Sequence, residues 1–186
     1  SEIDDRTKAL WELWKKSPLT FGKQKMWQAQ RKFSDKALTR GGRFYGAWTS
    51  MRQSERLKCT IEGQAVAEVD VSGMYPTLLC SITGHFPFTT RFKDPYEVEG
   101  IPRNEVKAVV GSAIGGGTTK QRTTTKMIKE AGITQKRLSE IRKVIIPKFK
   151  CLEALQKGVM DSETLAVHET EIMMRLVERL QQPIFI

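Results

Sequence analysis

The strongest constraint on the fold is a short segment whose side chains alternate between two faces and which ends at once in a turn. Successive side chains over residues 64–71 face two sides in turn, as in a strand with one buried side, and Ser72-Gly73 ends the pattern. Because Pro76 is tolerated in the first turn of a helix, the pattern predicts a strand, a tight turn and a helix over about 75–83. The carboxylate of Asp70 then lies at the exit of a buried strand.

The spacing of apolar residues and the helix-ending residues predict the remaining elements. The expected helices cover residues 3–16, 22–33, 102–114, about 135–146 with an extension past Pro147 to about 157, and about 162–181. Thr134 is expected to cap the fourth of these helices. The apolar stripe of the last helix is expected to contain Leu165, Ile172, Leu176 and Leu180.

Three further segments are expected to be short or irregular. Residues 41–46 predict a loop or hairpin, residues 84–101 predict mostly loop, and residues 183–186 predict the opening of a strand. Since a strand that opens in the last four residues has no return strand, we expect either that the natural polypeptide continues or that another chain completes the sheet.

Composition restricts the class of protein and its partners. The chain has 186 residues and a formal net charge of +10, which favours a polyanionic partner, nucleic acid being the commonest. No apolar run approaches the roughly 18 residues of a membrane helix, so no membrane partner is expected. The cysteines Cys59, Cys80 and Cys151 are odd in number and far apart, which argues against a disulfide framework or a zinc cluster and favours a reducing, cytoplasmic location.

Asp70 has the chemistry that phosphoryl transfer needs. A carboxylate at the end of a buried strand is costly unless it is paired or binds a metal, and two-metal catalysis needs such a rigidly held carboxylate. The alternative is that Asp70 merely caps the helix that follows. Glu68 shares its strand face and is expected to pair with a basic residue across the sheet.

The segment that starts at Asp70 resembles the first catalytic motif of template-dependent polymerases with a palm domain. In family-B enzymes the motif reads D-x-x-S-L-Y-P-S, which the chain matches at Asp70, Tyr75 and Pro76; the DNA polymerase I form, D-Y-S-Q-I-E, is matched at Asp70 and Ser72. The resemblance implies that Asp70 binds the catalytic Mg²⁺ (or Mn²⁺) ions and that the Val71 carbonyl binds one of them. It also implies that Tyr75 is a steric gate against a ribose 2′-hydroxyl.

Arg103 and Lys107 form the second motif. Positions four apart lie on one helical face, so both cations can reach one triphosphate; a solvated basic face is the alternative. The pair and the glycine-rich helix end after it resemble the finger helix of DNA polymerase I-type and phage-type RNA polymerases, R-x-x-x-K followed by Tyr-Gly. Ile114-Gly115-Gly116 lacks that tyrosine, so the usual platform beneath the base pair is missing or comes from elsewhere.

Arginines upstream of Asp70 form the third motif. Thr39-Arg40-Gly41-Gly42-Arg43, followed by Arg52 and Arg56, resembles the T-G-R segment and trailing arginines of DNA polymerase I-like enzymes. In that family these residues touch the primer-template backbone, which suits the planar guanidinium. The alternative is a basic surface loop.

The end of the chain completes the resemblance. In DNA polymerase I-like enzymes a long helix leads into a strand that carries a third motif, His-Asp, and this chain stops where that motif is expected. His168, Glu169 and Glu171 are interpreted as ordinary helix residues. The missing carboxylate is expected from a C-terminal continuation or a second chain.

The fold class expected from these motifs is α+β: an antiparallel palm sheet with flanking helices and a helical fingers element, incomplete at the C-terminus. The expected segments are residues 1–38, an N-terminal helical element; 39–101, the palm part with the first motif; 102–160, fingers-like helices; and 161–186, a palm helix and the start of the third-motif strand.

The expected function is that of a DNA polymerase-like nucleotidyltransferase of a phage or mobile-element type, acting on a DNA primer-template and dNTPs and incomplete alone. Two alternatives remain open. One is a non-catalytic nucleic-acid-binding module derived from a polymerase, and the other is a single-subunit RNA polymerase or primase-like enzyme.

Overall fold

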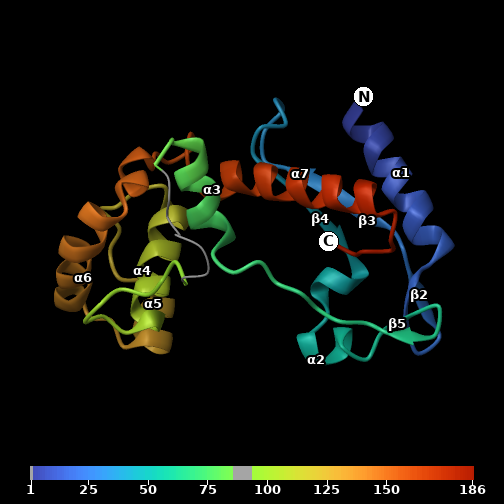
Figure 1. Cartoon of the computed structure of the whole chain (residues 1–186), viewed down its shortest axis with the longest axis horizontal. Helices are drawn as coiled ribbons and strands as arrows, with labels where there is room; N and C mark the ends of the chain where they lie inside the picture. The colour runs from blue at the N-terminus through green and yellow to red at the C-terminus, as the bar shows by residue number, and fades with distance from the viewer. Residues whose placement is uncertain (1, 86–93) are drawn as a thin grey trace. The chain divides into compact units, whose positions relative to one another are not determined.

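The computed structural model describes residues 2–85 and 94–186 and divides the chain into two compact units (Figure 1). The first unit contains the chain up to Asp70 together with Ala166–Ile186, and the second contains Val71–Leu165. Within the described residues the fold is mixed α+β, with seven α-helices, a four-stranded antiparallel sheet and a two-stranded sheet, as the fold class predicted. None of the described helices combines the length and the apolar character needed to cross a membrane.

The first unit begins with the expected N-terminal helix and continues into short strands. Its elements are α1 (Glu2–Lys16), β1 (Leu19–Phe21), β2 (Gln24–Met26), β3 (Ala29–Phe33), β4 (Gly41–Gly46), the 3₁₀ turn η1 (Ala47–Ser50), α2 (Gln53–Arg56), β5 (Thr60–Ile61) and β6 (Gln64–Ala65). The predicted helix over 22–33 is wrong. Gly22 adopts a φ of +59° in the two-residue turn between β1 and β2, which reverses the chain before a helix can form.

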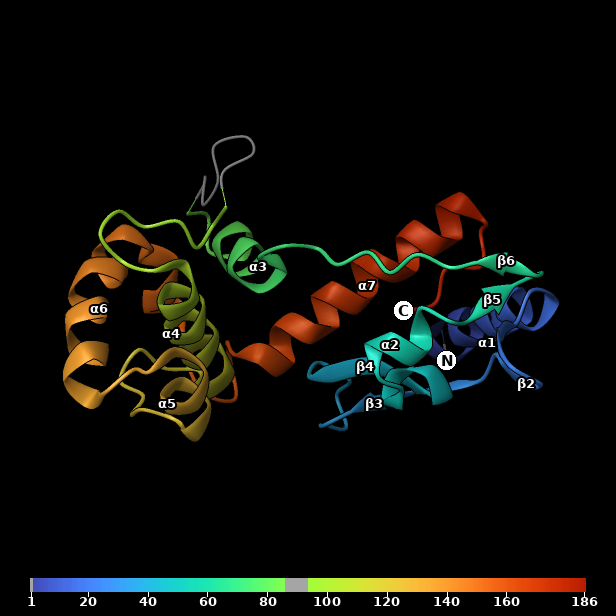
Figure 2. The same cartoon turned by 90° about the horizontal axis from the view of Figure 1, so that it is seen from below.

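Two antiparallel sheets form in this unit. The larger has the order β2-β1-β5-β6, and the smaller is the hairpin of β3 and β4. The loop or hairpin predicted at 41–46 is only partly right, because these residues form one whole strand of the hairpin and its other strand is Ala29–Phe33. β5 and β6 are joined by Glu62-Gly63, where both residues have positive φ, as a two-residue hairpin turn requires (Figure 2).

Aromatic side chains make the core of the first unit. Trp14 is fully buried, stacks on Phe185 with ring centroids 5.4 Å apart, and meets Trp48 edge-on at 5.4 Å. Its indole N–H donates to the Ile184 carbonyl at 2.9 Å, and the indole of Trp48 donates to the Ile186 carbonyl at 3.3 Å. The expected strand over 183–186 is therefore wrong, because these residues pack into the aromatic core without joining a sheet.

The second unit is helical in its described part. Its elements are α3 (Met74–Ile82), α4 (Arg103–Gly116), α5 (Thr125–Ala131), α6 (Gln135–Lys148), the 3₁₀ turn η2 (Lys150–Ala154) and the first residues of α7 (Ser162–Leu180). The helices predicted over about 75–83, 102–114 and about 135–146 are confirmed, and the Thr134 hydroxyl accepts from the Arg137 N–H as a cap. The helix expected to resume after Pro147 to about 157 is wrong, because α6 runs through Pro147 to Lys148 and only the turn η2 follows. Of the loop expected at 84–101, residues 86–93 lie outside the described residues, and Val98 and Ile101 form an isolated antiparallel bridge.

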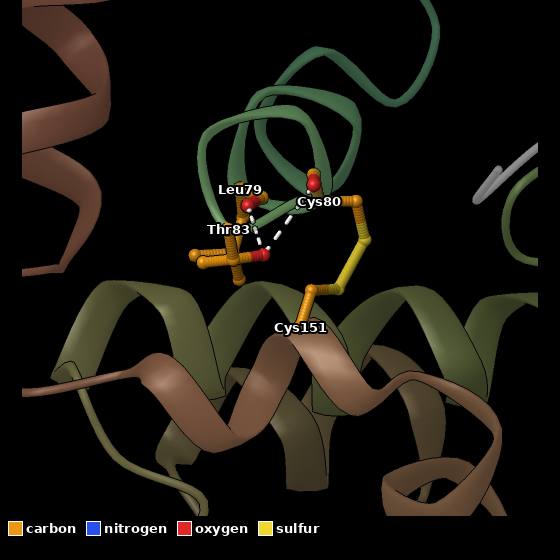
Figure 3. Close-up of a disulfide and its surroundings, with 4 residues drawn as sticks. All are labelled: Leu79, Cys80, Thr83 and Cys151. Atoms are coloured by element: carbon orange, nitrogen blue, oxygen red, sulfur yellow. Dashed lines mark hydrogen bonds between the residues drawn. A yellow bond between two sulfur atoms is a disulfide. The ribbon is translucent and has the colours of Figure 1, made fainter. Parts of the chain in front are cut away.

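A disulfide crosslinks the core of the second unit. Cys80 on α3 is bonded to Cys151 on η2, with 4.9 Å between their Cα atoms (Figure 3). The Thr83 hydroxyl donates to the Leu79 carbonyl at 2.7 Å and holds the end of α3 beside the bond. The expectation that the cysteines are too far apart to pair is wrong for these two, because the fold brings together residues 71 positions apart. Cys59, in the first unit, is free and buried.

The apolar stripe predicted on α7 is only partly right. Leu165 is fully buried, but Ile172, Leu176 and Leu180 are between 42% and 50% exposed. The helix instead buries Ala166, Thr170, Met174 and Val177. Apolar residues three or four positions apart define more than one possible apolar face on α7, and spacing alone does not show which of these faces is buried.

Candidate nucleotide and nucleic-acid sites

The cation pair of the second unit lies at the start of α4. Arg103 is the first residue of the helix and Lys107 lies one turn later, so the two side chains share a face, as predicted. The Arg103 guanidinium forms an ion pair with the Asp94 carboxylate. This contact and the Tyr96 N–H lower the pKa of Asp94, and the charge of Lys107 lowers that pKa further. Arg103 therefore pairs directly with this anionic position, and Lys107 adds positive charge on the same face of the helix.

A compact loop brings Asp94 to that position. The Asp94 carboxylate accepts from the backbone N–H of Tyr96 at 3.0 Å, and the Val98–Ile101 bridge then reverses the chain toward α4. The Arg103 guanidinium also lies 5.5 Å from the centre of the Tyr96 ring. The sequence interpretation missed Asp94, although Asp94-Pro95 and Gly100 are turn signals that could have indicated that the chain returns there.

The arrangement can bind an anion. Half of the Arg103 side chain remains exposed beside Asp94, and Lys107 is exposed. The neighbouring acid Glu105 is directed elsewhere, since its carboxylate pairs with Arg137 at 2.7 Å. A phosphate group presents anionic oxygen acceptors, as the Asp94 carboxylate does, and it carries more negative charge. It can therefore replace that carboxylate beside Arg103.

The turn before α3 packs against the same loop. Gly73 precedes the helix with a φ of +65°, and a Cβ added there would overlap Pro95. Tyr75 stands in the first turn of α3, half-buried against the unit's apolar core. The predicted nucleotide-binding residues Tyr75, Arg103 and Lys107 therefore all belong to the second unit, and the Gly73–Pro95 contact joins the segments that carry them.

Asp70 does not lie on a strand, and that prediction is wrong. β6 ends at Ala65, and residues 66–71 have no regular secondary structure (Figure 2). Val69 is 87% exposed and Val71 is 49% exposed, so the alternating pattern buries neither valine. Asp70 itself is exposed, and the cost of a buried carboxylate therefore gives no reason for a metal there. The predicted metal-binding role of Asp70 and of the Val71 carbonyl remains a prediction.

The surroundings of Asp70 in the first unit are partly acidic. Burial raises the pKa of Glu169 on α7, Arg43 lowers it, and the charge of Asp70 raises it slightly. Asp70 fits a single Mg²⁺ held by one carboxylate together with substrate phosphates. A two-ion site needs more carboxylates, and the described residues contain no cluster of three or more His, Cys, Asp or Glu side chains that could hold a metal. They do not fit a complete two-metal centre.

The three predicted phosphate-binding arginines lie in the first unit. Arg43 extends from β4, is 49% exposed and pairs with Glu169 at 3.4 Å. Arg56 pairs with Glu68 at 2.7 Å, which lowers the pKa of Glu68. The expected basic partner is thus confirmed, but the pair does not form across a sheet, because Glu68 lies outside the strands. Arg52 is exposed before α2, where its backbone N–H donates to Glu55 at 2.9 Å. Arg43 and Arg52 are thus accessible to a large anion, and Arg56 is held in place by an acid.

Comparisons of the chain with protein-family models, with curated proteins and with solved structures give no match.

Proposed function

We propose that this chain is the palm and fingers part of a template-dependent nucleotidyltransferase of the DNA polymerase I type, and that Arg103 and Lys107 bind the triphosphate of the incoming nucleotide. One observation carries the proposal: Arg103, which shares a face of α4 with Lys107, forms an ion pair with the Asp94 carboxylate. This end of the helix therefore already holds an anionic group.

The two cations suit different parts of the reaction. The guanidinium of Arg103 can donate two parallel hydrogen bonds to phosphate oxygens, and the ammonium of Lys107 acts as a compact charge. Positive charge beside the β- and γ-phosphates also stabilises the pyrophosphate that leaves when a primer 3′-hydroxyl attacks the α-phosphate. Asp94 would then be the residue that a triphosphate displaces.

Tyr75 and Asp70 have further proposed roles. Tyr75, in the first turn of α3, is proposed to exclude a ribose 2′-hydroxyl and so to favour dNTPs over rNTPs. Asp70 is proposed to bind a divalent cation, Mg²⁺ or Mn²⁺. Because a second carboxylate is needed for two ions, we expect weak or no extension by this chain unless a further segment or a partner supplies it.

A non-catalytic nucleic-acid-binding module is the second candidate. The exposure of Asp70 and the lack of a three-carboxylate group among residues 5–85 and 94–186 favour it over a complete enzyme. Such a module uses the basic residues of the chain but has no need for nucleotide binding that depends on a divalent cation.

Primer extension and nucleotide binding together separate these functions. The chain is assayed with dNTPs or rNTPs and with Mg²⁺ or Mn²⁺, and binding of a fluorescent dNTP is followed in parallel. We expect metal-dependent dNTP binding, and loss of any extension in Asp70→Ala with nearly unchanged DNA affinity. Wild-type-like extension by Asp70→Ala would refute the role of that residue, preferential rNTP use would indicate an RNA polymerase or primase, and nucleic-acid binding without nucleotide binding would indicate the binding module.

A further inference from the structure

We propose that the exposed face of the β3–β4 hairpin binds single-stranded nucleic acid, with a base stacked on Tyr45 and neighbouring phosphates bound by Lys32 and Arg43. The inference rests on the proposed function in taking a nucleic acid as the partner. It adds the strandedness of that partner and two residues, Lys32 and Tyr45, that the motifs did not indicate.

The register of the hairpin creates this face. Gln30 lies opposite Tyr45, and Lys32 lies opposite Arg43. These four side chains are exposed, whereas Ala29 and Phe44 on the other face are buried in the core of the first unit. One face of the hairpin therefore packs against the core of the first unit, and the other presents an amide, an aromatic ring and two cations to solvent.

Lys32 and Arg43 lie opposite each other on this face, and a bound anion would stabilise the pair. Like charges directly across an antiparallel pair destabilise it, and Lys32 and Arg43 are such a pair. Arg43 has Glu169 at 3.4 Å, which offsets part of the repulsion, and the Lys32 ammonium lies over the Tyr45 ring, 5.1 Å from its centre. A phosphodiester between the two strands would neutralise both cations at once.

The position of Tyr45 favours an unpaired nucleotide. Its side chain is 49% exposed on a sheet surface, a large area for an aromatic residue. An aromatic ring on a sheet binds bases by stacking, which requires that the base face is accessible, as in single strands. Since one sugar joins each base to its phosphates, a base on the Tyr45 ring brings a phosphate beside Lys32 and Arg43.

Fluorescence anisotropy with labelled oligonucleotides tests the proposal. Single-stranded and duplex DNA and RNA of mixed sequence are titrated with the wild-type chain and with Tyr45→Ala, Tyr45→Phe and Lys32→Ala, over a series of salt concentrations. Lys126→Ala is the matched control for Lys32→Ala, because Lys126 is a highly exposed lysine of α5 in the second unit. Sodium polyglutamate serves as an acidic polypeptide competitor.

The proposal predicts preferential binding of single strands. Tyr45→Ala should weaken it about tenfold, and Tyr45→Phe should keep it because the ring remains. Lys32→Ala should reduce the steepness of the salt dependence by about 0.7, the value for one phosphate contact on a single strand, with no change in Lys126→Ala. If the variants lose affinity for DNA and for RNA to a similar extent, the face contacts the base and the phosphate and does not distinguish the sugars.

Several results would overturn the inference. They are equal affinities of Tyr45→Ala and Tyr45→Phe, tighter binding of duplex without dependence on Tyr45, or competition by polyglutamate as strong as that by oligonucleotide. Binding of the fluorescent dNTP, measured on the same variants, separates this failure from failure of the proposed function. If dNTP binding is intact and Tyr45→Ala does not weaken binding of single strands, only the site on the β3–β4 hairpin is rejected. If Tyr45→Ala weakens binding of single strands but no dNTP binds, only the nucleotidyltransferase is rejected.

Discussion

Gly73 occupies a backbone position that other residues cannot take without strain. Its φ of +65° is in the left-handed region, and a Cβ would overlap the Pro95 ring. We expect Gly73→Ala to lower the free energy of unfolding by about 2–4 kcal/mol, roughly 1–2 from the backbone and the rest from the overlap. Urea denaturation measures the difference.

Gly84→Ala is the control for this prediction. Gly84 belongs to the same unit and has a φ of +71°, but no described atom lies within 4 Å of its added Cβ. It should therefore show only the backbone cost of about 1–2 kcal/mol. Equal losses in the two variants would mean that the packing of Gly73 against Pro95 does not exist in solution.

The positions of individual residues were predicted correctly where they depend only on neighbours in the sequence. Thr134 caps its helix, and Arg103 and Lys107 share a face because of helical spacing alone. The turn signals at Asp94-Pro95 and Gly100 indicate a reversal of the chain, but they do not identify Asp94 as the counter-ion of Arg103, because that contact depends on the exact geometry of the loop. Glu68 was expected to find a basic partner, but nothing in its spacing identified Arg56.

Among the elements, α1 and α7 are joined in the first unit by one arginine. Arg6 on α1 contacts Glu171 and Glu178 on α7, each at 2.7 Å. Burial raises the pKa of Glu171, but its hydrogen bonds from Arg6 and Arg175 outweigh that effect and leave the pKa below its usual value. The contacts are partly exposed, so their contribution is modest.

We expect Arg6→Met to lower the free energy of unfolding by about 1 kcal/mol at neutral pH. Because the folded protein depresses the pKa of Glu171, this contribution exists above the ordinary carboxyl pKa and is lost as the pH falls through the lower folded value. The difference between Arg6→Met and wild type should therefore vanish once the pH falls below the lowered pKa of Glu171. Lys126→Met, which breaks a far more exposed pair with Glu130, should show little effect at any pH. A difference independent of pH would assign the role of Arg6 to packing.

Helices were predicted better than strands, for a physical reason. A helix satisfies its own backbone hydrogen bonds, so apolar spacing and end signals were enough for α3, α4, α6 and α7. A strand requires a partner, and residues 66–71 alternate without one, because β5 has only two residues to pair with β6. The three-residue strands β1 and β2 were too short to show any alternation, and apolar residues within 22–33 imitated a helix.

At the scale of the whole molecule, the Cys80–Cys151 bond closes a long loop. Crosslinking residues 71 positions apart should stabilise the second unit by about 4 kcal/mol, if loop entropy dominates. We expect Cys80→Ala/Cys151→Ala, or reduction, to lower its melting temperature, whereas Cys59→Ala changes only the first unit. Titration of the denatured chain should find one thiol before reduction and three after it. Three thiols without reductant would contradict the bond.

The sequence patterns predicted the fold class but not the division of the chain into two units. The α+β class followed from the mixture of patterns, whereas the joining of Ala166–Ile186 with the chain up to Asp70 had no local signal. It depends on the aromatic core around Trp14. This residue stacks on Phe185 and donates a hydrogen bond to the carbonyl of Ile184, which lies 170 residues away in the sequence. Long-range pairing of this kind has no period that a sequence pattern can display.

The equilibrium affinity for a dNTP in Mg²⁺ tests the central claim most directly, because two variants should change it in opposite directions. Arg103→Ala removes a ligand and should weaken binding at least about tenfold. Asp94→Asn removes the competing carboxylate and should tighten binding about two- to fivefold, with Glu99→Gln, an acid in the same loop, as the control. Equal affinities in wild type, Arg103→Ala and Asp94→Asn would contradict a triphosphate site at the start of α4.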